Sequence, residues 1–241
     1  MDEIETGGLL GGRIAYRQFK SGHRTGFEPV LLAANVAAAA GELVLEAGTG
    51  AGAGLLCLAM RVPGVLGVGV ERDSGLARLA QKNFNSNNFS GIFAIQGDAV
   101  TLPFGSQKFH HIFANPPWFS CQSTASPDAL RALAHLANPE LLPAWIASLT
   151  RVLRPKGTLT LILPAASHAA ATAALREHYG CITLFPLWPR FGEPSKMVIV
   201  SARKGSKSPD RILPGMVLHD ADGITREAQA VLRDGASLKL G

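Results

Sequence analysis

The stretch Leu43-Val44-Leu45-Glu46-Ala47-Gly48-Thr49-Gly50-Ala51-Gly52 decides the fold, because a short apolar run leads into a glycine-rich turn. The run predicts a strand, and residues 52–60 after the turn predict a helix. Gly48 and Gly50 permit backbone conformations that a Cβ forbids, and they let the chain approach a ligand closely. The first turn of the helix adds free N–H donors. The stretch therefore predicts a strand–turn–helix unit that binds a ligand.

The acid before the glycines indicates what kind of ligand this is. In dinucleotide-binding proteins a G-x-G-x-x-G turn meets a pyrophosphate. Here the spacing is G-x-G-x-G, and Glu46 precedes it. A carboxylate at this position repels a phosphate but pairs with an ammonium group. The turn therefore favours a cofactor with an amino-acid end over a dinucleotide.

Outward from this unit, short apolar runs alternate with helical patterns, which is typical of a parallel α/β sheet. The predicted strands are 43–45, 66–70, 92–95, 111–114, 158–163, 182–187 and 197–202, and the other helices are 74–85, 141–152 and 165–178. Before them lie a hairpin within 9–19, turning at Gly11-Gly12, and a helix from Pro29 to Ala40. After them lie a strand at 216–218 and a helix at 225–232. We expect one domain, with an extension at 1–41, a core at 42–204 and a second extension at 205–241.

Two more acids follow the next predicted strands. Glu71 stands 19 residues after Gly52, where a carboxylate can accept hydrogen bonds from both hydroxyls of a ribose. Asp98 follows the third strand and can accept from an adenine amino group. Because the carboxyl ends of parallel strands meet at one edge of a sheet, these acids should lie beside the glycine turn. Together they predict a site for a nucleoside-containing cofactor.

The motif Asn115-Pro116-Pro117-Trp118 follows the fourth strand. Neither proline can donate a hydrogen bond, so the loop is stiff and its backbone presents mainly acceptors. The amide oxygen of Asn115 and the carbonyl of Pro116 can accept both hydrogens of a planar NH2 group, and Trp118 can stack on the ring that carries it. Such a clamp would aim the nitrogen lone pair at an electrophilic methyl group, chiefly by positioning and electrostatics.

Charge is distributed unevenly. The chain has 241 residues, a net charge of +5 and a pI near 9.4. Two basic stretches flank the core: Arg13, Arg17, Lys20 and Arg24, and then Arg190, Lys196, Arg203, Lys204, Lys207 and Arg211. They are either a phosphate-contacting surface for nucleic acid or an ordinary solvated surface. Glu28 has two readings as well: it begins a helix, or it faces the ligand.

Other features bound the class of protein. Hydrophobic residues make up 47% of the chain, a globular composition. The start shows no basic signal-peptide region, and the apolar run 30–40 is too short to span a bilayer. Three separated cysteines form no C-x-x-C pair, and the seven histidines show no metal-ligand spacing. We expect a cytoplasmic protein without a membrane partner or a metal.

These motifs resemble those of the bacterial tRNA1(Val) (adenine(37)-N6)-methyltransferase family, class I S-adenosylmethionine (SAM)-dependent enzymes with an N-P-P-[YFW] motif. The resemblance covers nearly the whole chain and is carried by residues 10–13, 25–34, 46–52, 114–119, 185–190, 192–194 and 217–223. It implies a Rossmann-like sheet of seven strands, five parallel and a final antiparallel pair. The commonest aromatic residue at the fourth motif position is Tyr, and Trp118 preserves the stacking surface.

The resemblance also implies residue roles. The candidate cofactor contacts are Glu46, Gly48, Thr49, Gly50, Gly52, Glu71, Arg72, Asp98, Ala99 and Asn115, and the target-base clamp is Asn115, Pro116, Pro117 and Trp118. The basic flanks and Glu28, and not the resemblance, supply the candidate RNA contacts, which are Arg13, Arg17, Lys20, Arg24, Glu28, Arg190, Lys196 and Lys204.

The predicted function is methylation of the exocyclic amino group of adenine in RNA, with tRNA as the expected substrate. One alternative keeps the chemistry and methylates a glutamine side chain in a protein. Enzymes of that kind carry a longer N-terminal domain than the 45 residues before Glu46, and the basic flanks favour RNA. The other alternative is a non-catalytic RNA-binding protein on the same fold.

Overall fold

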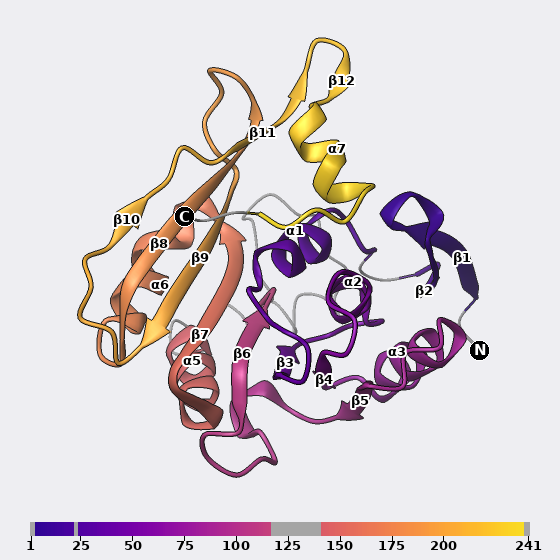
Figure 1. Ribbon diagram of the computed structural model, residues 1–241, viewed down its shortest axis with the longest axis horizontal. Helices are drawn as coiled ribbons and strands as arrows, with labels where there is room; N and C mark the ends of the chain where they lie inside the picture. Colours follow the sequence, from indigo (N-terminus) through magenta and orange to yellow (C-terminus); the bar gives the residue numbers. More distant parts are fainter. Residues whose placement is uncertain (1–2, 22–23, 117–140, 239–241) are drawn as a thin grey trace, which may run out of the picture.

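The computed structural model describes residues 3–21, 24–116 and 141–238, and their centre is one large sheet (Figure 1). Its strands are β3 (Leu43–Ala47), β4 (Leu66–Glu71), β5 (Ile92–Gln96), β6 (Phe109–Ala114), β7 (Leu153–Pro164), β8 (Tyr179–Arg190), β9 (Met197–Lys204), β10 (Arg211–Ile212), β11 (Met216–Asp220) and β12 (Gly223–Ile224). Their order is β12-β11-β8-β9-β7-β6-β3-β4-β5, and β10 also pairs with β8. All seven predicted core strands are present, so the expected α/β class is confirmed.

The direction of the last strands adds detail to the expected final pair. β9 lies between β7 and β8 and is antiparallel to both. β8 therefore runs in the same direction as β7, and among the seven core strands β9 alone runs in the opposite direction. The seven-strand expectation is too low for the whole sheet, because the tail adds three short strands. β11 pairs in parallel with β8, which covers an edge that would otherwise offer free N–H and C=O groups.

Helices cover both faces of the sheet. α1 (Glu28–Asn35), α2 (Ala53–Arg61), α3 (Ser74–Ser86) and α7 (Arg226–Leu232) contribute to one apolar core, and α5 (Leu141–Val152) and α6 (His168–Leu175) to the other. The strands supply both cores by alternation. On β7, Leu161 and Leu163 belong to the second core while Ile162 belongs to the first.

The helix predicted from Pro29 to Ala40 is wrong at its end. α1 stops at Asn35, and Val36 is already extended, with φ −73° and ψ 114°. Arg61, at the end of α2, donates to the carbonyls of Ala33 (2.9 Å) and Val36 (2.5 Å). These bonds satisfy carbonyls that a continuing helix would have bonded itself. A partner from a neighbouring helix therefore ends α1 despite the high helix propensity of the alanines that follow.

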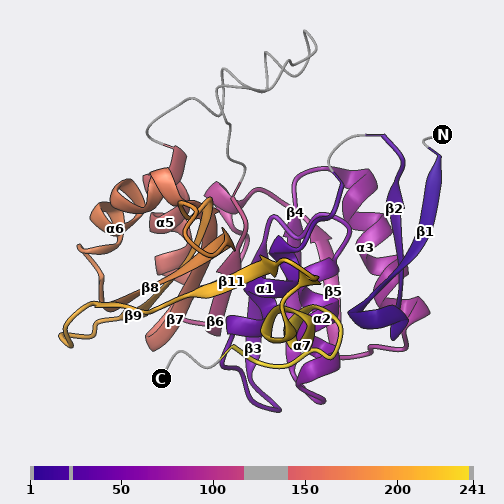
Figure 2. The same ribbon diagram turned by 90° about the horizontal axis from the view of Figure 1, so that it is seen from above.

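The predicted hairpin is confirmed and begins earlier than expected. β1 (Ile4–Leu9) pairs with β2 (Ile14–Phe19) around a short 3-10 turn, η1 (Leu10–Gly12). It rests on α3, as Figure 2 shows from above. Asn87 accepts from Ala15 N and donates to Ala15 O, and Asn83 exchanges the same pair of bonds with Arg17. Asn83 of α3 and Asn87, which caps its end, thus bind the hairpin as a neighbouring strand would.

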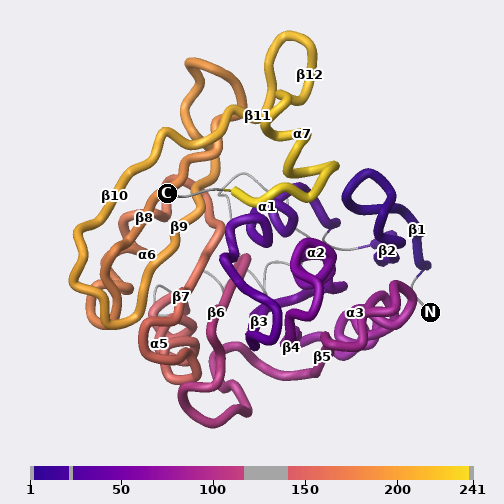
Figure 3. The backbone as a smooth tube through the Cα atoms, viewed as in Figure 1, coloured from indigo at the N-terminus to yellow at the C-terminus, as the bar shows by residue number. Residues whose placement is uncertain are grey.

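The tail returns to the first part of the chain (Figure 3). α7 packs on α1 and on the turn η1. Beyond α7, Leu238 N donates to Ala34 O at 2.9 Å, and Arg13 donates to Arg233 O at 3.1 Å. The predicted extensions at both ends of the chain therefore contact one another on the α1–α2 face.

Candidate functional site

Strand register brings four predicted segments to one edge of the sheet. Ala47 of β3 pairs with Ala114 of β6 on one side and with Val70 of β4 on the other. The residues that follow, Gly48, Asn115 and Glu71, are therefore neighbours at the carboxyl edge. Glu71 pairs in turn with Gln96 of β5, two residues before Asp98. The edge presents Asp98, Glu71, the glycine turn and Asn115 in that spatial order.

Glu46 is buried, with 4% of its surface exposed. Its Oε2 accepts from the Thr49 hydroxyl at 2.5 Å and from Leu55 N, in the first turn of α2, at 3.0 Å. Burial raises the pKa of this carboxyl to about 8, although both hydrogen bonds act in the opposite direction. Within the described residues Glu46 thus ties the glycine turn to the start of α2. Its contact with a cofactor stays a prediction.

The three glycines of the turn, Gly48, Gly50 and Gly52, all have a positive φ, but the atoms around them differ. A Cβ on Gly50 (φ +56°) would meet nothing within 4 Å, so open space lies above it. On Gly52 (φ +90°) a Cβ would lie 2.5 Å from the ring of Phe84. Gly52 is therefore required by the packing of α3 on α2, whereas Gly50 borders space that a ligand can fill.

The acids at the next two strand ends are held in place by backbone N–H groups. Glu71 accepts from Gly50 N and from Asp73 N, both at 2.9 Å, one bond on each carboxylate oxygen. Asp98 accepts from Val100 N at 2.9 Å and so caps η2 (Ala99–Thr101). Arg72 is exposed and Ala99 is buried.

At the motif, Asn115 is half-buried and Pro116 is buried. Pro117 and Trp118 lie outside the described residues. The clamp predicted from all four residues is therefore placed only through its first two, directly after β6.

Trp145 of α5 is a site neighbour that the sequence did not single out. A Cβ built on Gly48 would lie 3.2 Å from its ring, and 8% of Trp145 is exposed. The ring thus supports the glycine turn from the second core. Nothing in the apolar pattern of α5 distinguishes this position, because contact with residue 48 is non-local.

Glu28 begins α1, as one of its two readings expects. Because α1 precedes β3 and connects to its opposite end, the first turn of α1 lies toward the same carboxyl edge. The Glu28 carboxylate is folded back over Gly26. Phe27, just before it, is 44% exposed.

Most of the predicted RNA contacts have partners within the chain. Arg17 donates to Ser86 (2.8 Å), and Lys20 and Arg24 form ion pairs with Glu3 (2.8 Å) and Glu5 (2.7 Å). Arg190 lies 3.9 Å from Glu193, and Lys196 is exposed. Exposed ion pairs of this kind contribute little, so these side chains can exchange their partners for phosphates.

Arg13 and Lys204 differ, because their partners are backbone carbonyls. Arg13 donates to Leu10 O and Arg233 O, which joins the hairpin turn to the tail. Lys204 donates to Thr150 O (2.5 Å) and Leu153 O (2.7 Å) at the end of α5, and burial lowers its pKa. These bonds argue against a role for Lys204 in binding RNA.

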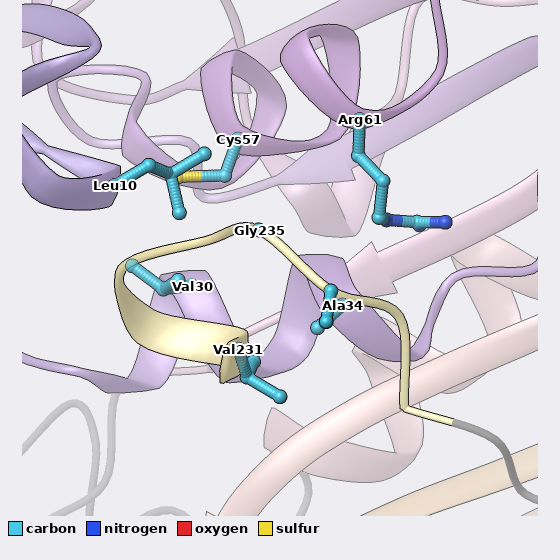
Figure 4. Close-up of a pocket in the computed structure, with 8 residues that line it drawn as sticks. Leu10, Val30, Ala34, Cys57, Arg61, Val231 and Gly235 are labelled. Atoms are coloured by element: carbon cyan, nitrogen blue, oxygen red, sulfur yellow. The ribbon is translucent and has the colours of Figure 1, made fainter. Parts of the chain in front are cut away.

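A small hollow lies under the tail, away from this edge (Figure 4). It is lined by Leu10, Val30, Ala34, Cys57, Arg61, Val231, Gly235 and Ala236. Burial raises the pKa of the Cys57 thiol to about 12, so the thiol is neutral. The hollow is largely apolar and lies between residues of the tail, α1 and α2.

Two findings concern the described residues only. No helix among them is long and apolar enough to cross a membrane. In the same part of the chain, no group of three or more His, Cys, Asp or Glu side chains is placed to hold a metal ion.

Comparison with known proteins agrees with this geometry. Residues 44–157 match the family described as "Methyltransferase domain". The chain is 28% identical over 209 residues to a tRNA1(Val) (adenine(37)-N6)-methyltransferase of Actinobacillus succinogenes, covering 82% of this chain and 86% of that protein.

Solved structures share the fold. A predicted O-methyltransferase from Agrobacterium tumefaciens superposes with a TM-score of 0.74 at 22% identity, over 87% of this chain and 97% of the other. The geranyl diphosphate C-methyltransferase from Streptomyces coelicolor, solved with S-adenosyl-L-homocysteine, gives 0.55 at 13% identity over 73% and 75%.

Proposed function

We propose that the chain is a class I SAM-dependent methyltransferase and that it transfers the methyl group of SAM to the exocyclic amino group of an adenine in RNA, with tRNA as the substrate. The relatives named tRNA1(Val) (adenine(37)-N6)-methyltransferase support the choice of base and of RNA. An RNA substrate of this kind supports a cytoplasmic location.

One observation carries the proposal: the pairing of Ala47 with Ala114, which sets Asn115 beside the glycine turn. A group that accepts hydrogen bonds from a planar NH2 then lies next to the turn at which a cofactor would bind. The same edge continues to Glu71 and Asp98. Ligands of open α/β sheets bind at such carboxyl ends.

The residues at this edge fit the cofactor. The space above Gly50 is open, although Thr49 and Ala51 on either side of it are buried. Glu71 is held by two N–H groups in an orientation that leaves further lone pairs for ribose hydroxyls. Asp98 uses one oxygen for Val100 N and has the other for an adenine amino group. We assign ribose binding to Glu71 and adenine binding to Asp98 and Ala99.

When bound, SAM supplies an electrophilic methyl group on a sulfonium. The Asn115 amide oxygen and the Pro116 carbonyl would accept hydrogen bonds from the amino group of the target adenine and so would orient its nitrogen lone pair toward the methyl group. Trp118 stacks on the base. Because the amide acts on the reacting nitrogen, its loss should lower kcat more than it raises KM.

The test is methyl transfer from tritiated SAM to total RNA and to total protein, followed by nucleoside and amino-acid analysis. We expect labelled N6-methyladenosine in tRNA. Asn115→Ala should bind the cofactor normally and lose most transfer, whereas Asn85→Ala, an exposed asparagine on α3, should behave as wild type. Label at glutamine in a protein fraction, with none in tRNA, would establish the alternative substrate.

A further inference from the structure

The turn between β8 and β9 presents an aromatic ring to solvent. Phe191 is 94% exposed, more than any other large hydrophobic side chain of the described residues; Ile212 follows at 77%. A single exposed apolar side chain is common on protein surfaces. Keeping a phenylalanine ring in water, with almost no contact to its own chain, has an unfavourable free energy that a binding partner would relieve.

The turn that carries Phe191 is well built. Glu193 N donates to Arg190 O at 3.2 Å, and Gly192 takes the positive φ of +79° that closes the turn. Ser195 lies within hydrogen-bond distance of the carbonyls of Leu187 (3.0 Å) and Met197 (2.7 Å), which joins the two strands below it. The ring is therefore held outward on a backbone of fixed shape.

The sheet places Phe191 on the side of its carboxyl edge but far from the proposed position of the target base. Pairing through β7 and β9 sets Leu187 three residues beyond the level of Ala114. Phe191 is thus six residues farther along the strand direction than Asn115, or roughly 20 Å, and three strand spacings add roughly 14 Å sideways. The separation is roughly 25 Å, and the β8–β9 loop extends past the central strands in Figure 1.

The turn carries a cation near each of its ends. The side chain of Arg190 is 64% exposed and lies 3.9 Å from Glu193, and Lys196 is exposed at the other end of the turn. A flat apolar surface between two cations suits a nucleic acid, since a base can stack on the ring while phosphates meet the charges. An apolar protein partner would offer Lys196 no anionic group and would leave Arg190 with its long, exposed contact to Glu193.

We propose that Phe191 stacks on an unpaired base of the RNA substrate, roughly 25 Å from the methylated adenine, while Arg190 and Lys196 bind the phosphates beside it. This inference rests on the proposed function and extends it to a second contact point. Such a contact selects an RNA by the distance between two unpaired bases. It acts on RNA binding and leaves the chemical step unchanged.

The experiment measures binding of an unmodified tRNA1(Val) transcript to the full chain at fixed salt. Phe191→Ala should raise the Kd about tenfold, the range of one base–aromatic stack, and Phe191→Tyr should keep wild-type affinity. Ile212→Ala is the matched control, because it removes another exposed apolar side chain far from the turn. Calorimetry should show unchanged SAM binding for all variants, and kcat at saturating RNA should not change.

A second readout detects stacking itself. Phe191→Trp should show fluorescence quenching on addition of the transcript beyond that of the wild-type tryptophans. Equal Kd values for wild type and Phe191→Ala, or no added quenching, would overturn the inference about Phe191. If wild type still methylated RNA in that case, the proposed function would stand. A Phe191→Ala variant whose sedimentation shows loss of a dimer would also overturn it, because a second copy would then cover the ring. Wild type that methylates no RNA refutes the proposed function instead.

Discussion

Replacing Glu46 by glutamine tests the burial of the acid that leads the glycine turn. Glutamine keeps the shape and an oxygen that can accept from Leu55 N and the Thr49 hydroxyl, but it cannot ionise. In the folded chain the pKa of Glu46 is about 8, against 4.5 in its ordinary environment. The folded state therefore prefers the protonated acid.

The size and sign of the effect follow from this difference. A shift of about 3.5 units, at about 1.4 kcal/mol per unit, corresponds to about 5 kcal/mol. Because the folded pKa is raised, the stabilisation is complete below the unfolded pKa and is lost as the pH rises through about 8. Wild type should thus lose stability from about pH 5 to about pH 9, and Glu46→Gln should lack this part of the loss.

Urea denaturation followed by circular dichroism, at constant ionic strength, measures both proteins across that range. Glu42→Gln is the control of opposite sign. Burial opposes ionisation of Glu42, but hydrogen bonds from Ala39 N and His111 lower its pKa overall. Its stabilisation is therefore present at neutral pH and lost in acid. If the difference in unfolding free energy between wild type and Glu46→Gln stays constant from about pH 5 to about pH 9, Glu46 is not held as a buried neutral acid.

Three further predictions use the packing around the site. Gly52→Ala should destabilise the fold by at least about 1–2 kcal/mol in urea denaturation, because a positive φ and the Phe84 ring both oppose a Cβ; a silent change would contradict the packing. Lys204→Met should lower the free energy of unfolding by about 1–3 kcal/mol, because two carbonyls lose their donor. It should leave the salt dependence of tRNA binding unchanged, whereas Lys196→Gln should flatten that dependence. The reverse pattern in filter binding would refute the structural role of Lys204 and the phosphate-binding role of Lys196. Trp118→Ala should weaken transition-state binding by about 1–3 kcal/mol in kcat/KM while Trp118→Tyr is nearly silent, and equal losses in both would exclude stacking.

The sequence predicted the parts of the fold that local patterns determine. Strands at β3 to β9 follow from apolar runs, and the acids Glu71 and Asp98 follow because a parallel sheet collects its strand ends. It did not predict where α1 ends, since Arg61 lies 25 and 28 residues from the carbonyls it bonds. The sequence also did not predict the pairing of β11 with β8. The tail strand is short, and the free edge of β8 exists only once the sheet has formed.

The sequence predicted which edge of the sheet holds the candidate site, but it did not predict the hydrogen bonds of the individual side chains there. The prediction that Glu46 pairs with an ammonium group stays a prediction. What the sequence did not show is that this carboxyl is hydrogen-bonded to the Thr49 hydroxyl and to Leu55 N. It grouped Lys204 with the basic surface because net charge says nothing about carbonyls that a distant helix end presents. The sequence analysis also did not single out Phe191, which lies between the predicted strands 182–187 and 197–202, because exposure is a property of the folded surface.

The contact between the two ends of the chain has a consequence for biosynthesis. Arg13 meets its carbonyl partner 220 residues later, and Ala34 accepts from Leu238. Until the tail has left the ribosome, the outer side of α1 and the turn of the hairpin have no cover. The nascent protein must therefore carry an apolar face while about 200 further residues are made, a period of tens of seconds at rates of about 5–20 residues per second. A ribosome that stops within this interval releases a chain whose uncovered face is exposed to chaperones and proteases.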